Sequence, residues 1–150
     1  RCGCGNFGDL EGEARRDAII ERAVRKIYAG RKTILTDMVG PKYYDLTPAM
    51  IAEAASKGDE VALEVMEETG YYVGIGVANV INFLNVEMVV IGGGISQAGP
   101  VLWDPIMRTV RANALKEALE VCQVVPAALG DDAGIMGGVV LVLQEMESCV

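Results

Sequence analysis

Histidine is absent from this sequence of 150 residues. The chain by itself therefore lacks the base of Ser-His-Asp and Cys-His nucleophiles, and it cannot form a mixed cysteine–histidine zinc site. Cysteine is scarce and occurs only at Cys2, Cys4, Cys122 and Cys149. This spacing does not build a disulfide framework, so we expect a reducing, cytoplasmic setting.

Long apolar runs are missing as well. No stretch of about 18 apolar residues occurs without a polar break, so we expect no membrane-spanning helix. A signal peptide is not visible either. The chain begins with Arg1 rather than Met, and we expect that an N-terminal segment precedes it in the whole protein.

Basic residues are outnumbered, with 13 Lys and Arg against 21 Asp and Glu and a net charge of −8. Binding to a nucleic-acid backbone needs clustered basic side chains, so we expect no nucleic-acid partner for this segment. Seven of the basic residues lie between Arg15 and Lys32. We interpret this stretch as a solvated helix face rather than a nucleic-acid groove binder.

Apolar residues make up 51% of the chain, and its length suits one domain, residues 1–150, with a core of its own. Hydrophobic periodicity and capping residues predict helices that alternate with two apolar, β-branched strands, which is typical of an α/β sheet. Residues 32–36 read as a short strand or as a connector. The expected helices are 11–29, 48–57, 60–84, 100–116 and 133–146, and the expected strands are 86–91 and 121–125.

The helix over 60–84 is the most informative of these elements. Asp59 is its predicted N-cap, as Thr47 is for the helix that precedes it. From Val73 onward the sequence is apolar nearly all round, so we expect this second half to be deeply buried. Gly74 and Gly76 lower helix propensity, and we expect them to allow close packing.

The chain has eighteen glycines, and ten of them cluster at residues 3–8, 92–94 and 130–138. The first cluster matches G-x-G-x-x-G, but no strand precedes it, so we reject a dinucleotide-binding fold. Gly92, Gly93 and Gly94 follow a strand directly. They form either a tight turn or a loop that lets a ligand approach the backbone. Asp131 and Asp132 read as helix caps.

The N-terminal loop has a second pattern. Cys2, Cys4 and Asp9 could face a common metal if the intervening glycines let the loop wrap tightly. On spacing alone, a Cys/Gly turn that holds nothing is the alternative.

Four stretches together resemble the ROK family of bacterial sugar kinases and regulators. Residues 1–11 (RCGCGNFGDLE) are similar to the family signature C-x-C-G-x-x-G-C-x-E, and residues 70–85, 89–99 and 129–138 also resemble family motifs. The resemblance covers nearly the whole chain. It implies the C-terminal lobe of an actin/hexokinase-like (ASKHA, ribonuclease H-like) kinase, with a mixed sheet and flanking helices.

The resemblance also implies a function. Family kinases transfer the γ-phosphate of ATP, bound with Mg²⁺, to a sugar such as glucose. The signature Glu that contacts the sugar corresponds to Glu11, and the glycines near the nucleotide correspond to Gly92, Gly93 and Gly94. The family's catalytic Asp belongs to a preceding segment, so we expect this chain alone to be inactive. Family members are often oligomers, and we expect a homo-oligomer here.

One departure from the family pattern concerns zinc. Asp9 stands where the signature has its third Cys, and the family's His ligand would lie upstream of Arg1. We therefore predict that this chain carries no stoichiometric zinc and that residues 1–10 are mobile. Two alternatives to a kinase stay open: the effector-binding domain of a ROK transcriptional repressor, and a structural relic that binds no ligand.

Overall fold

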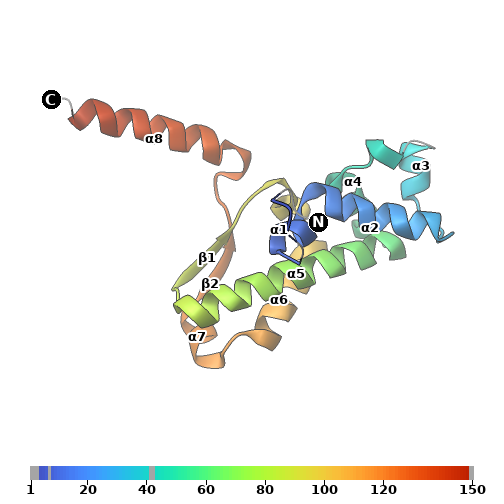
Figure 1. Ribbon diagram of the computed structural model, residues 1–150, viewed down its shortest axis with the longest axis horizontal. Coiled ribbons are helices and arrows are strands. Elements are labelled where there is room, and N and C mark those ends of the chain that lie inside the picture. The colour runs from blue at the N-terminus through green and yellow to red at the C-terminus, as the bar shows by residue number, and fades with distance from the viewer. Residues whose placement is uncertain (1–3, 7, 41–42, 149–150) are drawn as a thin grey trace.

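The computed structural model of this chain describes residues 4–6, 8–40 and 43–148. A body of helices continues into a two-stranded sheet, and the last helix projects away from both (Figure 1). The helices are α1 (Leu10–Ala14), α2 (Arg16–Tyr28), α3 (Leu35–Val39), α4 (Pro48–Ser56), α5 (Glu60–Leu84), α6 (Pro100–Asn113), α7 (Lys116–Val121) and α8 (Ala133–Ser148). The strands are β1 (Met88–Ile91) and β2 (Gln123–Pro126), and short 3-10 turns occur at η1 (Tyr43–Asp45), η2 (Gly94–Ala98) and η3 (Gly130–Asp132).

Helix α5 is the axis of the helical body, and its predicted bounds are confirmed. The Asp59 carboxylate accepts a hydrogen bond from the Ala62 N–H and caps the first turn. The helix ends where Asn85 adopts the left-handed conformation, with φ 47°. The predicted Thr47 cap of α4 is confirmed too, because its hydroxyl accepts from the Met50 N–H.

Helix α6 packs closely along α5, and glycine makes this approach possible. A Cβ added to Gly74 would lie 2.6 Å from Thr109 Cβ and 2.9 Å from the Ile106 carbonyl oxygen. Real Cβ atoms do not approach other atoms so closely. The expectation that glycines in this helix allow close packing is therefore confirmed at Gly74.

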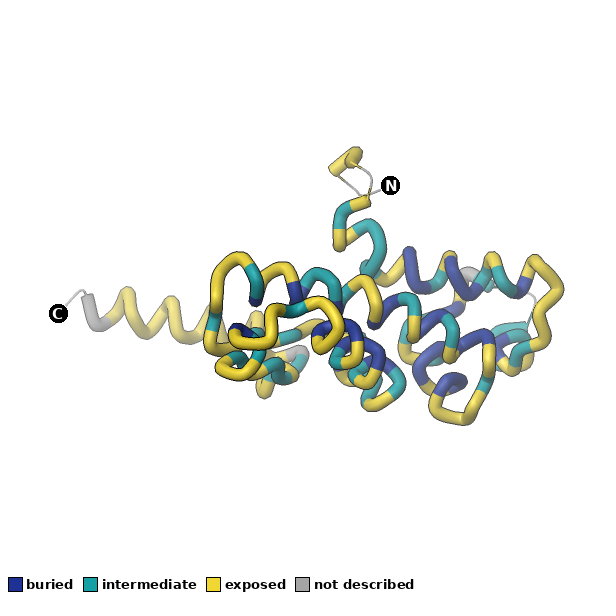
Figure 2. The backbone as a smooth tube through the Cα atoms, turned by 90° about the horizontal axis from the view of Figure 1, so that it is seen from below, coloured by how far each residue is buried: buried dark blue, intermediate teal, exposed yellow. Residues whose placement is uncertain are grey.

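The core lies between α2, α4, α5 and α6. Its fully buried side chains include Ile19, Leu46, Ile51, Met66 and Ile106. Figure 2 shows the dark blue, buried segments gathered in this bundle. The two faces of α5 that meet α4 and α6 supply much of the core.

The expectation of deep burial for residues 73–84 is wrong. Gly74, Val77 and Ile81 are buried, but Phe83 is 85% exposed and Leu84 68% exposed. The reason is geometric: an all-round apolar helix is buried all round only if other elements surround it, and α5 meets α6 on one side here. An apolar sequence allows a helix to be buried on every side, but it does not show which sides other elements cover.

The strands β1 and β2 are parallel, with Met88 opposite Gln123 and Ile91 opposite Pro126. They form a two-stranded sheet in the described part of the chain, rather than the mixed sheet expected. β1 begins two residues later than predicted, and although its residues are apolar, Met88 and Val90 are exposed on one face. β2 likewise begins two residues later, since α7 occupies the residues before it.

The predicted helix over 11–29 is two helices. Arg15 breaks it with an extended ψ of 158°, so that α1 and α2 run in different directions and both pack on α5. Residues 32–36 contain no strand. Asp59 accepts from Thr33 Oγ1 and from the Ile34 N–H, which holds the connector before α3. The helix predicted over 100–116 ends at Asn113, and a separate α7 follows.

Helix α8 matches the predicted helix over 133–146 and extends it to Ser148. Figure 2 shows it as an exposed arm. Its apolar side chains, among them Ile135, Leu141 and Leu143, are more than half exposed. Within the residues that the structure describes, no helix has the length and apolar character needed to cross a membrane.

Candidate functional site

Two loops meet at the carboxyl ends of the parallel strands. Gly92, Gly93 and Gly94, here called the glycine loop, follow β1, and residues 127–130 follow β2. The Ala127 N–H donates to the Ile91 carbonyl at 2.9 Å, and Gln97 lies against Gly130. Ligands in α/β sheets bind at this edge, so the geometry makes these loops a candidate binding site.

The backbone of the glycine loop requires glycine at one position. Gly93 has φ 94°, a conformation that L side chains rarely adopt, although a Cβ there would meet nothing within 4 Å. Gly94 has an ordinary φ, and the space around its missing Cβ is also open. The loop is thus exposed and accessible from outside rather than packed beneath other residues.

Ser96 and Trp103 hold this loop in shape. The Gly93 carbonyl accepts from the Ser96 N–H at 3.0 Å and from the Ser96 hydroxyl at 2.7 Å. The Ser96 carbonyl in turn accepts from Trp103 Nε1 at 2.8 Å. Trp103 lies on α6, so the core of the helical body fixes the loop at the end of β1.

A hollow of about 400 Å³ lies beside the glycine loop. Its lining joins three parts of the chain: the junction of α1 and α2, the N-terminus of α4, and the loop itself. The lining residues are Ala14, Arg16, Ile19, Thr47, Pro48, Ala49, Gly94 and Ile95. A second hollow of about 330 Å³ shares Ala49, Gly94 and Ile95 with it. Residues from distant parts of the sequence therefore meet here.

Glu11 lies on α1, one helical turn before Ala14 of the hollow, and its side chain is exposed. Helix α1 begins at Leu10 because the Asp9 carboxylate accepts from the Gly12 N–H at 2.6 Å. The structure therefore brings the helix that carries Glu11 close to the glycine loop, but it does not place Glu11 in the hollow itself.

The proposed metal ligands are only partly described. Cys2 lies outside the described residues, as do residues 1, 3 and 7. Cys4 Sγ donates to Asp9 Oδ2 at 3.5 Å, while the other Asp9 oxygen caps α1. Among the described residues, no three His, Cys, Asp or Glu side chains are grouped as metal ligands would be. The described residues alone do not make a closed four-ligand zinc site, and the zinc content of the chain stays a prediction.

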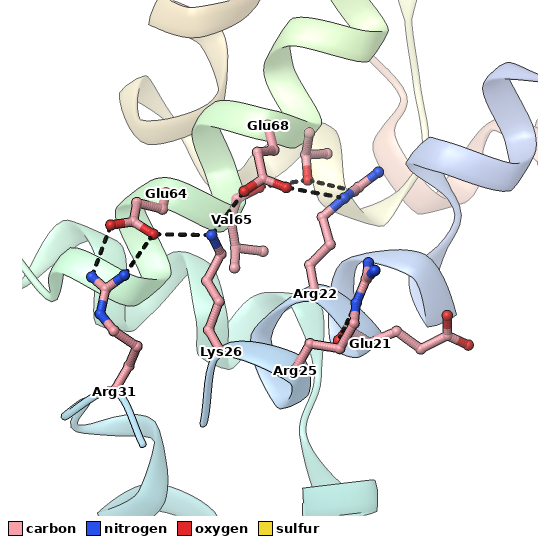
Figure 3. A network of polar contacts seen from close by, with 9 residues as sticks. Glu21, Arg22, Arg25, Lys26, Arg31, Glu64, Val65 and Glu68 are labelled. Carbon is pink, nitrogen blue, oxygen red and sulfur yellow. Dashed lines mark hydrogen bonds and ion pairs between the residues drawn. The ribbon is translucent and has the colours of Figure 1, made fainter. Parts of the chain in front are cut away.

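The basic stretch from Arg15 to Lys32 is not simply a solvated face. Figure 3 shows its side chains reaching across to the acidic first half of α5. Lys26 Nζ lies 2.9 Å from Glu64 Oε2 and 2.8 Å from Glu68 Oε1, and Arg31 Nη2 lies 2.8 Å from Glu64 Oε1. Basic side chains of α2 and of the loop after it thus form ion pairs with acidic side chains of α5.

These ion pairs shift two pKa values. The hydrogen bonds from Arg31 and then Lys26 lower the pKa of Glu64 to about 2. The hydrogen bond to Glu68 raises the pKa of Lys26 above its ordinary value, against a smaller opposing effect of burial, and Glu64 adds to the increase. Both shifts favour the charged forms, so the pairs stabilise the packing of α2 on α5 near neutral pH.

Sequence analysis did not single out Arg22, which is the most buried charged residue of this network at 4% exposed. A signal was present, because Arg22 lies on the same helical face as Ile19 and Ala23. A charge within an apolar stripe indicates a buried partner. Ser96 and Trp103 were missed for a different reason: Ser96 is a neighbour of the loop in the sequence, but its hydrogen bond to Gly93 and the hydrogen bond that it accepts from Trp103 depend on the 3-10 turn η2 and the start of α6.

The model of the ROK family matches residues 1–145. The glucokinase of Halalkalibacterium halodurans is 37% identical over 147 residues, which are 98% of this chain and 44% of that protein. The DNA-binding transcriptional dual regulator NagC of Escherichia coli K12 is 35% identical over 146 residues, 97% of this chain and 34% of that protein.

A solved structure, a ROK family glucokinase from Streptomyces griseus in complex with glucose and AMPPNP, has a TM-score of 0.83. It is 29% identical and covers 93% of this chain and 46% of its own. The likeness confirms the expected α/β fold class, that of actin/hexokinase-like sugar kinases. The chain spans less than half the length of each of these three proteins.

Proposed function

We propose, on the premise that this chain belongs to the ROK family, that it is the C-terminal part of an ATP-dependent glucokinase-like enzyme. The observation that carries the proposal is the exposed glycine loop, held at the carboxyl end of β1 beside the loop that follows β2. Phosphoryl transfer depends on positioning and charge stabilisation from several sides of the substrates. This chain would supply one side, and the catalytic Asp would come from the remainder of the enzyme.

The glycine loop is suited to the nucleotide. Its backbone is exposed, Gly93 has a conformation that favours glycine, and no neighbour fills the space beside Gly93 or Gly94. ATP could therefore approach the main chain closely there. Mg²⁺ would come with the ATP phosphates, because the described residues offer no cluster of three ligands of their own.

Glu11 is suited to the sugar. It is exposed on α1, and an ionised carboxylate accepts hydrogen bonds from two neighbouring hydroxyl groups at once. The hollow between α1, α4 and the glycine loop lies one helical turn away. The sugar and the nucleotide would then occupy adjoining positions, as transfer between them requires.

A second candidate is the effector-binding domain of a ROK repressor. The 35% identity to NagC over 97% of the chain favours it almost as strongly as the likeness to glucokinase favours the kinase. In this case the same loops would bind a sugar as a signal, and a separate segment would bind DNA. The net charge of −8 argues that this chain would not be the DNA-binding part.

One experiment separates the two candidates. The whole protein is incubated with glucose, ATP and Mg²⁺, and the formation of ADP and sugar phosphate is measured. The kinase proposal predicts turnover, and it predicts that Glu11→Gln raises the KM for glucose more than the KM for ATP. If the protein binds glucose without turnover and a sugar releases it from DNA, the regulator is the correct assignment.

The proposed kinase would act in the cytoplasm, where ATP is available. We also infer that it is a homo-oligomer, as family members often are. Apolar side chains such as Phe83 and Leu141 are exposed on the described part of this chain, and apolar surface of this extent is typical of an interface. Light scattering of the whole protein measures its oligomeric state directly.

A further inference from the structure

Helix α1 is too short to be stable by itself. It has five residues, and it is followed by the extended Arg15. Isolated helices shorter than about 12 residues are marginal in water, so the orientation of α1 depends on what anchors it. The side chain of Glu11, which the proposed function assigns to the sugar, is oriented only as well as this helix is held.

Contacts at both ends of α1 anchor it to the protein. The Asp9 carboxylate caps its first turn, and the Leu10 side chain lies against Gly76 of α5. At its other end, Glu13 Oε2 lies 2.6 Å from Arg22 Nη2. The last contact crosses from α1 to α2, so it bridges the break at Arg15.

The Arg22 side of this pair is rigid. Its side chain is 4% exposed, its Nη1 donates to Thr69 Oγ1 at 3.4 Å, and its Nε lies 3.6 Å from Glu68 Oε2. The guanidinium also lies 5.1 Å from the centre of the Tyr72 ring. Figure 3 shows Arg22 directed at α5, beside the Glu68 carboxylate. Because these contacts fix the Arg22 side chain on α5, the ion pair holds Glu13 in one position.

Glu11 and Glu13 point to different sides of α1. Residues two apart on a helix do not face each other. One side of the helix is thus tied to the body of the protein through Glu13, while Glu11 is left exposed on another side. The Glu13–Arg22 ion pair can therefore orient Glu11 without itself binding the sugar.

We propose that Glu13 and Arg22 are positioning residues for the sugar: their ion pair fixes α1 and so places Glu11 for hydrogen bonding to the substrate. The proposal rests on the proposed function, because it takes Glu11 as the sugar contact. Neither Glu13 nor Arg22 needs to touch the sugar, the nucleotide or the transferred phosphate.

Glu13→Ala and Glu13→Gln test the proposal in the whole protein. Glu64→Ala is the matched control, because it removes a carboxylate from the same network at Lys26 and Arg31, away from α1. We expect Glu13→Ala to raise the KM for glucose about tenfold, since misplacing a substrate contact by 1 Å is costly. The KM for ATP should stay within about twofold, and Glu13→Gln should lie between Glu13→Ala and the wild type.

Amide hydrogen exchange of residues 10–14 measures the positioning without any ligand. We expect it to accelerate in Glu13→Ala and to stay unchanged in Glu64→Ala. Unchanged exchange, or a glucose KM equal to that of the wild type, overturns the proposal, and so does an equal rise of both KM values. If Glu13→Ala does not fold, Glu13→Gln provides the same comparisons.

The failure of the proposed function is recognised separately. It is seen in the wild-type protein, which would then neither bind nor phosphorylate glucose. The exchange of residues 10–14 would still decide whether the Glu13–Arg22 pair holds α1.

Discussion

Gly74→Ala tests the close packing of α5 on α6. The added Cβ would lie 2.6 Å from Thr109 Cβ and 2.9 Å from the Ile106 carbonyl oxygen. Carbon atoms prefer separations of about 3.5–4.0 Å, so α6 would have to move by about 1 Å. The backbone carbonyl cannot rotate away, which makes this shift a displacement of a whole helix against the core.

The size of the effect follows from two opposing contributions. Overpacking a core costs about 1–3 kcal/mol, and replacing Gly by Ala inside a helix returns about 1 kcal/mol. We therefore expect Gly74→Ala to lower the free energy of unfolding by up to about 2 kcal/mol. In a chain of this length that corresponds to a decrease of up to roughly 8 °C in Tm.

Gly76→Ala is the matched control, two residues along the same helix. Its Cβ would meet Leu10 Cδ2 at 2.7 Å, the end of a flexible and half-exposed side chain that can turn aside while the Asp9 cap and the Glu13–Arg22 ion pair still hold α1. We expect this variant to be as stable as the wild type or more stable by up to about 1 kcal/mol. Urea unfolding followed by circular dichroism measures both variants. If the two alanines have the same effect on stability, the packing argument is wrong.

Three further predictions concern the site and its support. Gly94→Ala should leave the unfolding midpoint unchanged but weaken nucleotide binding, because its Cβ meets no protein atom yet would stand where ATP approaches the main chain of the loop. Gly93→Ala should also destabilise the chain by about 1–2 kcal/mol through its positive φ. Calorimetric titration with ATP analogues and thermal melts measure both effects. Since the pKa of Glu64 is lowered to about 2, its ion pairs stabilise the fold above its ordinary pKa and this contribution is lost as the pH falls toward 2. The stability difference between the wild type and Glu64→Gln should therefore be present at pH 7 and be mostly lost by pH 2, and a difference as large at pH 2 as at pH 7 would contradict the assignment. Ile81→Asp places an unpaired charge at a fully buried position of α5 and should unfold the chain, so an unchanged circular-dichroism melt would refute that placement.

Local chemistry made part of the fold predictable. Thr47 and Asp59 each accept a hydrogen bond from the backbone N–H three residues further on. Because these cap residues can be recognised in the sequence, the starts of α4 and α5 were predictable. The break at Arg15 was not predictable in the same way. Its cause is the packing of two separate helices on α5, and the periodicity of residues 11–29 runs through it.

The candidate site likewise has one part that was predictable from the sequence and one that was not. The glycine loop was predictable because three glycines after a strand form a local pattern. Its attachment through Ser96 to Trp103, and the hollow it shares with the start of α4, depend on helices that meet only in space.

Helices α4, α5 and α8, the caps at Thr47 and Asp59, the place of the glycine loop and the family were all readable from the amino-acid sequence, because each is encoded in neighbouring residues or ordered motifs. The partners of the apolar and charged side chains became visible with the packing of the helices. The apolar end of α5 is exposed at Phe83, while the charged Arg22 is buried against α5. Burial is a property of what packs around a residue, and that is set by contacts between residues far apart in the chain.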